Sequence, residues 1–152
     1  MPRSHSRSLD LSLSPRETFA LLVTPSAIRG WWGAERAIVL PREGGVWAAA
    51  WGGREDDPDY VTEARISIFD PPKRLRLSGF SYYARSGPLP FPSELLATEF
   101  SVAPARGGSL LTVVQSGFPD DARADDFFAG CERGWQETFE GIRRFAQATG
   151  VG

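Results

Sequence analysis

The sequence contains one cysteine, Cys131, one histidine, His5, and one lysine, Lys73. A single cysteine excludes an intrachain disulfide and a zinc site built from several cysteines. The other basic residues are arginines, which stay protonated and make poor general bases. The residue types that most often act as nucleophile or general base are therefore almost absent. The composition predicts neither a metal site nor a bound cofactor.

Long apolar runs and a strong charge of either sign are also missing. The longest uninterrupted apolar stretch, 46–51, is far shorter than the roughly 20 residues of a membrane-spanning helix. Residues 1–7 lack the apolar segment of a signal peptide, so we expect a cytoplasmic protein. The net charge of −2 speaks against a nucleic-acid partner. With 152 residues, 41% of them hydrophobic and 24% charged, the chain has the size and balance of one globular domain over 1–152.

Alternating hydrophobicity predicts an antiparallel sheet. Leu9, Leu11 and Leu13 lie on one face of a first strand, and His5 and Arg7 share that face if the strand begins earlier. Six further strand-like runs follow, separated by turns rich in glycine, proline or acidic residues: 34–40, 46–51, 60–69, 75–83, 94–102 and 109–118. Consecutive strands joined by hairpin-length turns pair antiparallel.

The same alternation predicts which side chains of these runs point inward. We expect inward faces formed by Trp47, Ala49 and Trp51, by Ala64, Ile66 and Ile68, by Leu75 and Leu77 continuing towards Tyr83, and by Thr98, Phe100 and Val102. Glu63 and Glu99 have the opposite parity and should face water, which argues against a catalytic pair of carboxylates.

Three helices complete the predicted fold. Ser14, Pro15 and Glu17 form a helix start, because serine caps, proline fits the first turn and glutamate reaches back. A second short helix runs from 25 through 28 and is closed by the glycine-flanked tryptophans at 30–33. A long helix spans about 122–149. Its apolar stripe contains Cys131, Trp135, Thr138, Phe139, Ile142, Phe145 and Ala146. The fold class is therefore α+β, with this helix covering one face of the sheet.

Six short motifs, in this order along the chain, carry a resemblance to a known family: SPRETF at 14–19, PSAIRGWW at 25–32, EGGVW at 43–47, DPPKRL at 70–75, GSLLTV at 108–113 and GWQETF at 134–139. The chain resembles the bacterial family related to the activator of the ninety-kilodalton heat-shock chaperone ATPase. That family belongs to the START and birch-pollen-allergen-like (SRPBCC) superfamily. Two segments depart from the family pattern: 40–43 replaces an Asp-x-Arg, and 84–93 is unusually rich in proline.

The resemblance implies a helix-grip fold. A curved antiparallel sheet of six to seven strands would wrap around the long C-terminal helix, with two short helices after the first strand. A cavity would lie between the sheet and the helix. Most bacterial members of the family have no assigned reaction.

A set of mostly apolar side chains is predicted to line this cavity. The set contains Trp31, Trp32, Trp47, Ala49, Trp51, Ile66, Leu77, Phe100, Val113, Gln115, Phe128, Cys131 and Trp135. Apolar walls with a few polar groups are typical of small-molecule sites. Gln115 and Arg7 are the candidates for orienting a ligand. In the alternative interpretation these side chains fill an ordinary core, and the tryptophans plug the end of the sheet.

The sequence therefore leaves three functions open. The first is binding of a small hydrophobic or aromatic molecule in the cavity. The second is protein interaction, including chaperone co-regulation, although no sequence feature supports a chaperone partner. The third is a cofactor-free cyclase or hydrolase that uses the same cavity. Dimerisation through the sheet edges is compatible with the pattern but not required by it.

Two further features have ordinary structural explanations. A dyad of His5 and Cys131 is disfavoured, because His5 lies near the chain terminus and Cys131 lies on the apolar helix stripe. The acidic segment 55–59 lacks the glycine and the distant glutamate of a calcium loop, so we expect a solvated hairpin turn.

Overall fold

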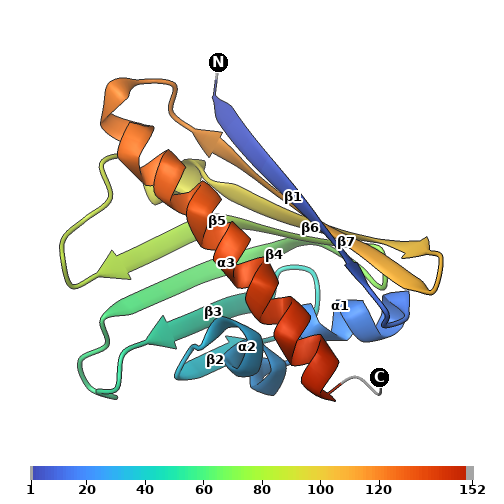
Figure 1. Cartoon of the computed structure of the whole chain (residues 1–152). Helices are drawn as coiled ribbons and strands as arrows, with labels where there is room; N and C mark the ends of the chain where they lie inside the picture. The colour runs from blue at the N-terminus through green and yellow to red at the C-terminus, as the bar shows by residue number, and fades with distance from the viewer. Residues whose placement is uncertain (1, 150–152) are drawn as a thin grey trace.

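Residues 2–149 are described by a computed structural model, in which one antiparallel sheet curves around a long helix (Figure 1). The strands are β1 (Arg3–Leu11), β2 (Arg36–Val39), β3 (Val46–Trp51), β4 (Tyr60–Asp70), β5 (Arg74–Ala84), β6 (Ala97–Ala105) and β7 (Gly108–Phe118). The sheet has seven strands in the order β1-β7-β6-β5-β4-β3-β2. Consecutive strands are therefore neighbours, except that β1 pairs with β7.

The helices are α1 (Pro15–Val23), α2 (Pro25–Trp32) and α3 (Asp125–Thr149), with short 3-10 turns η1 (Ser93–Leu95) and η2 (Ala122–Ala124). In Figure 1, α3 crosses the sheet diagonally on its concave side, and α1 and α2 lie near the C-terminal end of α3. The predicted α+β helix-grip fold is confirmed. No helix within residues 2–149 combines the length and the apolar character needed to cross a membrane.

The predicted start of α1 is confirmed, whereas the predicted end of α2 is wrong. Ser14 accepts a hydrogen bond from the backbone N–H of Glu17, and the Glu17 carboxylate accepts one from the backbone N–H of Ser14. Helix α2 continues past Ile28 to Trp32. It ends at Gly33, whose φ of 73° is left-handed and suits glycine.

Two β-bulges change which side chains of β4 and β5 point inward, so the predicted inward faces of these strands are wrong in part. Ile66 pairs with Leu77 but Ile68 pairs with Arg76, so β4 contains one extra residue, and Phe69 rather than Ile68 packs on the core. An extra residue reverses the alternation of side chains beyond it.

The bulge on β5 is centred on Gly79, which has a left-handed φ of 63°. Glu63 pairs with Ser81 and Arg65 with Ser78, so three residues of β5 span two of β4. Beyond the bulge Tyr82 is half-buried on the concave face and Tyr83 is 49% exposed, so the predicted alternation towards Tyr83 is wrong.

The core fills the space between the sheet and the helices. Its largest fully buried side chains include Trp47, Phe100, Ile66, Leu75, Leu111 and Ile142. The buried positions of α3 follow the predicted stripe: Trp135, Phe139, Ile142 and Ala146. A smaller cluster around Phe91 and Phe118 packs against the first turns of α3. The tight packing of the second half of α3 leaves its first half as the place where a cavity can form.

Candidate functional site

A cavity of about 430 Å³ lies between the concave face of the sheet and the first half of α3. It forms where the sheet splays apart: β5 and β6 pair only from Arg74 and Ser101 to Leu77 and Thr98, whereas β5 continues to Ala84. The walls comprise Trp32, Trp47, Thr62, Leu77, Phe80, Tyr82, Leu96, Thr98, Phe100, Gln115, Asp126, Phe127, Gly130, Cys131, Gly134, Trp135 and Thr138. The volume lies within the range of roughly 300–1,000 Å³ that is typical of small-molecule sites.

Two glycines of α3 form part of the cavity wall. Gly130 and Gly134 are four residues apart, so they lie on the same side of the helix, and both line the cavity. A Cβ added to Gly134 would meet no heavy atom within 4 Å, and one added to Gly130 would meet only an arginine side-chain tip at 4.0 Å. Both cavity-lining positions therefore have room for a larger side chain. Neither glycine was among the predicted site residues.

A row of three polar side chains crosses the sheet and reaches the cavity wall. His5 lies opposite Gln115, and Gln115 lies opposite Thr98, on three neighbouring strands. The Nε2 atom of His5 is 2.9 Å from Oε1 of Gln115, and Nε2 of Gln115 is 3.2 Å from Oγ1 of Thr98. Gln115 therefore has partners on both sides. His5 bonds Gln115 rather than Cys131, so the disfavoured dyad is not formed.

Burial favours the neutral form of two titratable groups in the cavity wall, Cys131 and Tyr82. It raises the pKa of the Cys131 thiol to about 12, so the thiol keeps its proton at neutral pH and behaves as an apolar group. It also raises the pKa of the Tyr82 hydroxyl above its ordinary value. Apart from Asp126 at the start of α3, the cavity wall therefore presents neutral donors and acceptors within a mainly apolar surface.

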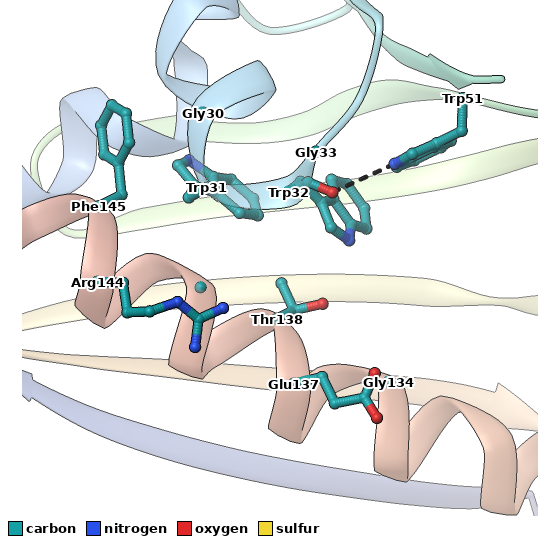
Figure 2. A pocket seen from close by; sticks show the side chains of 11 residues that line it. Gly30, Trp31, Trp32, Gly33, Trp51, Gly134, Glu137, Thr138, Arg144 and Phe145 are labelled. Atoms are coloured by element: carbon teal, nitrogen blue, oxygen red, sulfur yellow. Dashed lines mark hydrogen bonds between the residues drawn. The ribbon is translucent and has the colours of Figure 1, made fainter. Parts of the chain in front are cut away.

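A second, outer groove of about 720 Å³ lies between α2 and α3. Figure 2 shows Trp31, Trp32 and Trp51 along one side of it and Glu137 and Arg144 along α3. The Nε1–H of Trp51 donates to the carbonyl oxygen of Trp32 at 3.3 Å, drawn as a dashed line in Figure 2.

Trp32 lines both the groove and the cavity, together with Gly134 and Thr138. Its ring contacts all four other tryptophans, with centroid distances of 5.3 Å to Trp31, 5.6 Å to Trp47, 4.9 Å to Trp51 and 5.6 Å to Trp135. The indole of Trp32 is thus a partition between the two spaces. Trp31 is fixed more firmly, because it is 4% exposed and its Nε1–H donates to the carbonyl oxygen of Leu21 at 2.8 Å.

Residues 12–147 match the family model described as activator of Hsp90 ATPase homolog 1-like protein. The chain belongs to this family. The resemblance drawn from the six sequence motifs is confirmed. No match was found among curated proteins.

Solved structures similar to this family member share its fold at low sequence identity. The protein MLL2253 from Mesorhizobium loti has 22% identity and a TM-score of 0.75, covering 98% of this chain and 100% of its own. An AHSA1-like protein from Aeromonas hydrophila has 15% identity and a TM-score of 0.73, with 99% and 96% covered. The Aha1 dimer from Colwellia psychrerythraea has 14% identity and a TM-score of 0.74, with 99% of each chain covered.

The predicted site residues of this family member divide into three groups. Trp32, Trp47, Leu77, Phe100, Gln115, Cys131 and Trp135 line the cavity. Trp31 and Trp51 line the outer groove. The remaining residues line neither space. Ala49, Ile66 and Val113 are 3%, 0% and 0% exposed and belong to the core. The ring of Phe128 packs on His5 and Phe118, and Arg7 lies half-buried on β1.

Several residues of the cavity wall were not predicted from the sequence. Phe80 and Tyr82 lie beyond the bulge at Gly79, where the simple alternation fails. A glycine inside a strand pattern is a recognised sign of a bulge, so Gly79 was the available signal. Thr98 was placed on the correct face but not identified as a site residue.

The acidic residues discussed above have structural partners. Glu99 bonds Arg74 with Nε to Oε2 at 3.0 Å, and Glu63 lies 3.7 Å from Arg65. In the acidic turn, Asp57 and Asp59 both bond Arg85, at 2.7 and 3.1 Å. Arg85 follows β5 directly, so these bonds link the end of β5 to the turn between β3 and β4.

Proposed function

We propose that this protein binds a small, mainly apolar molecule in the cavity between the sheet and α3. The observation that carries the proposal is a space of about 430 Å³ with largely aromatic and aliphatic walls. Exposed apolar surface inside a folded domain is costly, and burial of a ligand there gains roughly 25 cal/mol per Å² before the entropic cost of binding.

The aromatic walls are held in position before any ligand arrives, which supports binding. The Nε1–H of Trp47 donates to the carbonyl oxygen of Leu22 at 3.1 Å. The rings of Phe100 and Trp135 meet edge to face with centroids 5.7 Å apart. A preorganised wall lowers the conformational entropy that binding must overcome. Of the two candidates for orienting a ligand, Gln115 lies on this wall and supports the proposal, whereas Arg7 does not.

Native mass spectrometry of protein purified gently from its own host tests the proposal. We expect an additional mass of a few hundred daltons that is lost on denaturation. A matched pair of variants shows where it binds: Gly130→Phe places a ring in the cavity, and Gly130→Ala makes the same loss of glycine while adding one methyl group. Gly130→Phe should lose the bound mass and Gly130→Ala should keep it.

Three results count against the proposal. One is wild-type protein without a bound mass that also fails to bind the uncharged fluorescent probe N-phenyl-1-naphthylamine. Another is equal retention of the ligand by both variants, which would place the ligand elsewhere, for example in the outer groove. The third is loss of the ligand from Gly130→Ala alone, which would attribute the effect to altered helix stability.

As a second function we propose self-association through strand β2. This strand lies at one edge of the sheet, where a second strand can add, and Ile38 on it is 64% exposed. The nearby Leu40 is 42% exposed. The similar protein from Colwellia psychrerythraea is described as an Aha1 dimer. Sedimentation analysis should show a dimer that Ile38→Lys converts to monomer; a monomeric wild type at high concentration would refute this second proposal.

A further inference from the structure

The polar row across β1, β7 and β6 has a fixed direction. The Oε1 atom of Gln115 is a carbonyl oxygen and can only accept, so Nε2 of His5 carries the hydrogen in the 2.9 Å bond. Nε2 of Gln115 then donates to Oγ1 of Thr98 at 3.2 Å. Donation therefore runs from His5 through Gln115 to Thr98, and each step orients the next group.

The row ends at Thr98 with a hydroxyl hydrogen that lacks an acceptor. Thr98 is 2% exposed and lines the cavity. Its next cross-strand neighbour is Leu77, which has an apolar side chain and is 1% exposed. Among residues 2–149, no hydrogen bond donated by Thr98 is present. A buried O–H group without an acceptor costs free energy, so an acceptor on a ligand in the cavity would be favoured there.

The charges around the cavity indicate which kind of hydrogen-bond acceptor the ligand carries. Among the described residues that line the cavity, Asp126 is the only one with a charged side chain, and it is exposed at the start of α3. A carboxylate on the ligand would therefore lose its hydration without gaining a cationic partner, and it would be repelled by Asp126. An uncharged oxygen acceptor such as a ketone, ester or amide carbonyl avoids both costs.

Building on the function proposed above, we propose that the ligand is a neutral aromatic molecule with a carbonyl-type oxygen, and that Thr98 donates the hydrogen bond to that oxygen. The rings of Phe100, Trp135 and Tyr82 supply the aromatic contacts around it. Gln115 and His5 act as positioning residues, because they set which way the Thr98 hydroxyl points. In this proposal Thr98, and not Gln115, bonds the ligand directly, and Gln115 orients Thr98 through one hydrogen bond.

Three naphthalenes of matched shape test this inference by isothermal titration calorimetry. 2-Acetylnaphthalene carries a carbonyl oxygen, 2-isopropenylnaphthalene replaces that oxygen with a methylene group, and 2-naphthoate carries a carboxylate. We expect the wild type to bind the ketone about threefold to tenfold more tightly than the alkene, which is the typical net effect of one hydrogen bond. The carboxylate should bind at least about tenfold more weakly than the ketone.

Variants at Thr98 show whether the hydroxyl causes the preference. Thr98→Val keeps the shape but removes the hydroxyl, so it should bind the ketone no more tightly than it binds the alkene. Thr98→Ser keeps the hydroxyl and should restore the preference. The carbonyl stretching frequency of the bound ketone adds a direct readout: it should be lower in the wild type and in Thr98→Ser than in Thr98→Val.

The outcomes separate this inference from the proposed function. Equal affinities for the ketone and the alkene in the wild type would overturn the inference and leave the proposed function standing, and this comparison needs no variant to fold. A preference that survives in Thr98→Val, or tighter binding of the carboxylate than of the ketone, would also overturn it. Failure of every naphthalene to bind the wild type would overturn the inference, and it would overturn the proposed function as well if the purified protein carried no bound mass.

Discussion

Helix α3 approaches α2 so closely at Gly141 that a Cβ atom added there would lie 2.5 Å from the carbonyl oxygen of Trp31. Gly30 makes the reciprocal contact, since a Cβ on it would overlap the ring of Phe145. The two helices therefore meet through glycines on both sides. Gly130, about three turns earlier in α3, faces open space instead. The glycines of α3 thus have opposite roles at its two ends.

Alanine at Gly141 and at Gly130 should consequently change stability in opposite directions. Gly130→Ala should raise the free energy of unfolding by about 0.5–1 kcal/mol, because alanine favours the helix and meets nothing. Gly141→Ala gains the same propensity but forces α2 and α3 apart, for a net loss of about 1–2 kcal/mol. Urea unfolding followed by tryptophan fluorescence measures both. Equal stabilisation by the two substitutions would show that α2 and α3 do not pack as described.

A buried hydroxyl pair ties α1 to the sheet. Thr18 and Ser109 are both fully buried, with their hydroxyl oxygens 2.6 Å apart, and Ser109 donates to the carbonyl oxygen of Leu13 at 2.9 Å. Ser109→Ala should lower the free energy of unfolding by about 1–3 kcal/mol, because it leaves two buried polar groups without partners.

An exposed hydroxyl pair provides the control for that substitution. Ser8 and Thr112 also lie 2.9 Å apart across two strands, but they face solvent, so water replaces the lost partner. Ser8→Ala should change the free energy of unfolding by less than about 0.5 kcal/mol. If both variants lost a similar amount of unfolding free energy, the effect would come from the strand positions and not from the burial of the hydroxyl pair.

The partition formed by Trp32 can be tested through the other tryptophans. Trp32→Ala should join the groove to the cavity, expose Trp47 and Trp135 to solvent, and lower the free energy of unfolding by about 2–3 kcal/mol. Acrylamide should then quench the remaining fluorescence more strongly than in the wild type. Trp51→Ala is the matched control, because Trp51 lines the groove but not the cavity. Equal quenching in the two variants would show that Trp32 does not separate the two spaces.

The fold was largely predictable because its signals are local. The alternation of Leu9 and Leu11, the capping residues of α1 and the apolar stripe of α3 each follow from the period of one element. The errors arise where a single residue changes that period. The extra residue in β4 turns Phe69 inward in place of Ile68, and Gly79 does the same for Tyr82 in place of Tyr83.

The cavity was less predictable because it depends on what the elements leave unfilled. Trp32, Gln115 and Trp135 were among the expected wall residues, and they line the cavity. Val113 has the same parity as Gln115 but is 0% exposed and belongs to the core cluster that includes Phe139 and Ile142 of α3. Parity gives the face of a strand, whereas the position of the helix above it decides whether that face is core or cavity.

The Cys131 thiol should make the stability of the protein depend on pH in a defined window. Burial raises the pKa of this thiol from 9.0 to about 12. Between these values the unfolded chain has released the proton and the folded chain still holds it. The unfolded state binds fewer protons there, so the free energy of unfolding falls as pH rises from about 9 towards about 12 and is unaffected by Cys131 below that window.

Comparison with Cys131→Ala isolates this effect, because tyrosine and lysine side chains titrate in the same range in both proteins. The difference in unfolding free energy between wild type and variant should be constant from pH 7 to pH 8.5. From pH 9 to pH 10.5 the wild type should lose stability relative to the variant. Alkylation by iodoacetamide at pH 8 should also be slow in the folded protein, since a pKa of about 12 in place of 9.0 lowers the thiolate fraction about a thousandfold. A pH-independent difference together with rapid alkylation would mean that the cavity wall at Cys131 is open to water, and the apolar character assigned to that wall would then be wrong.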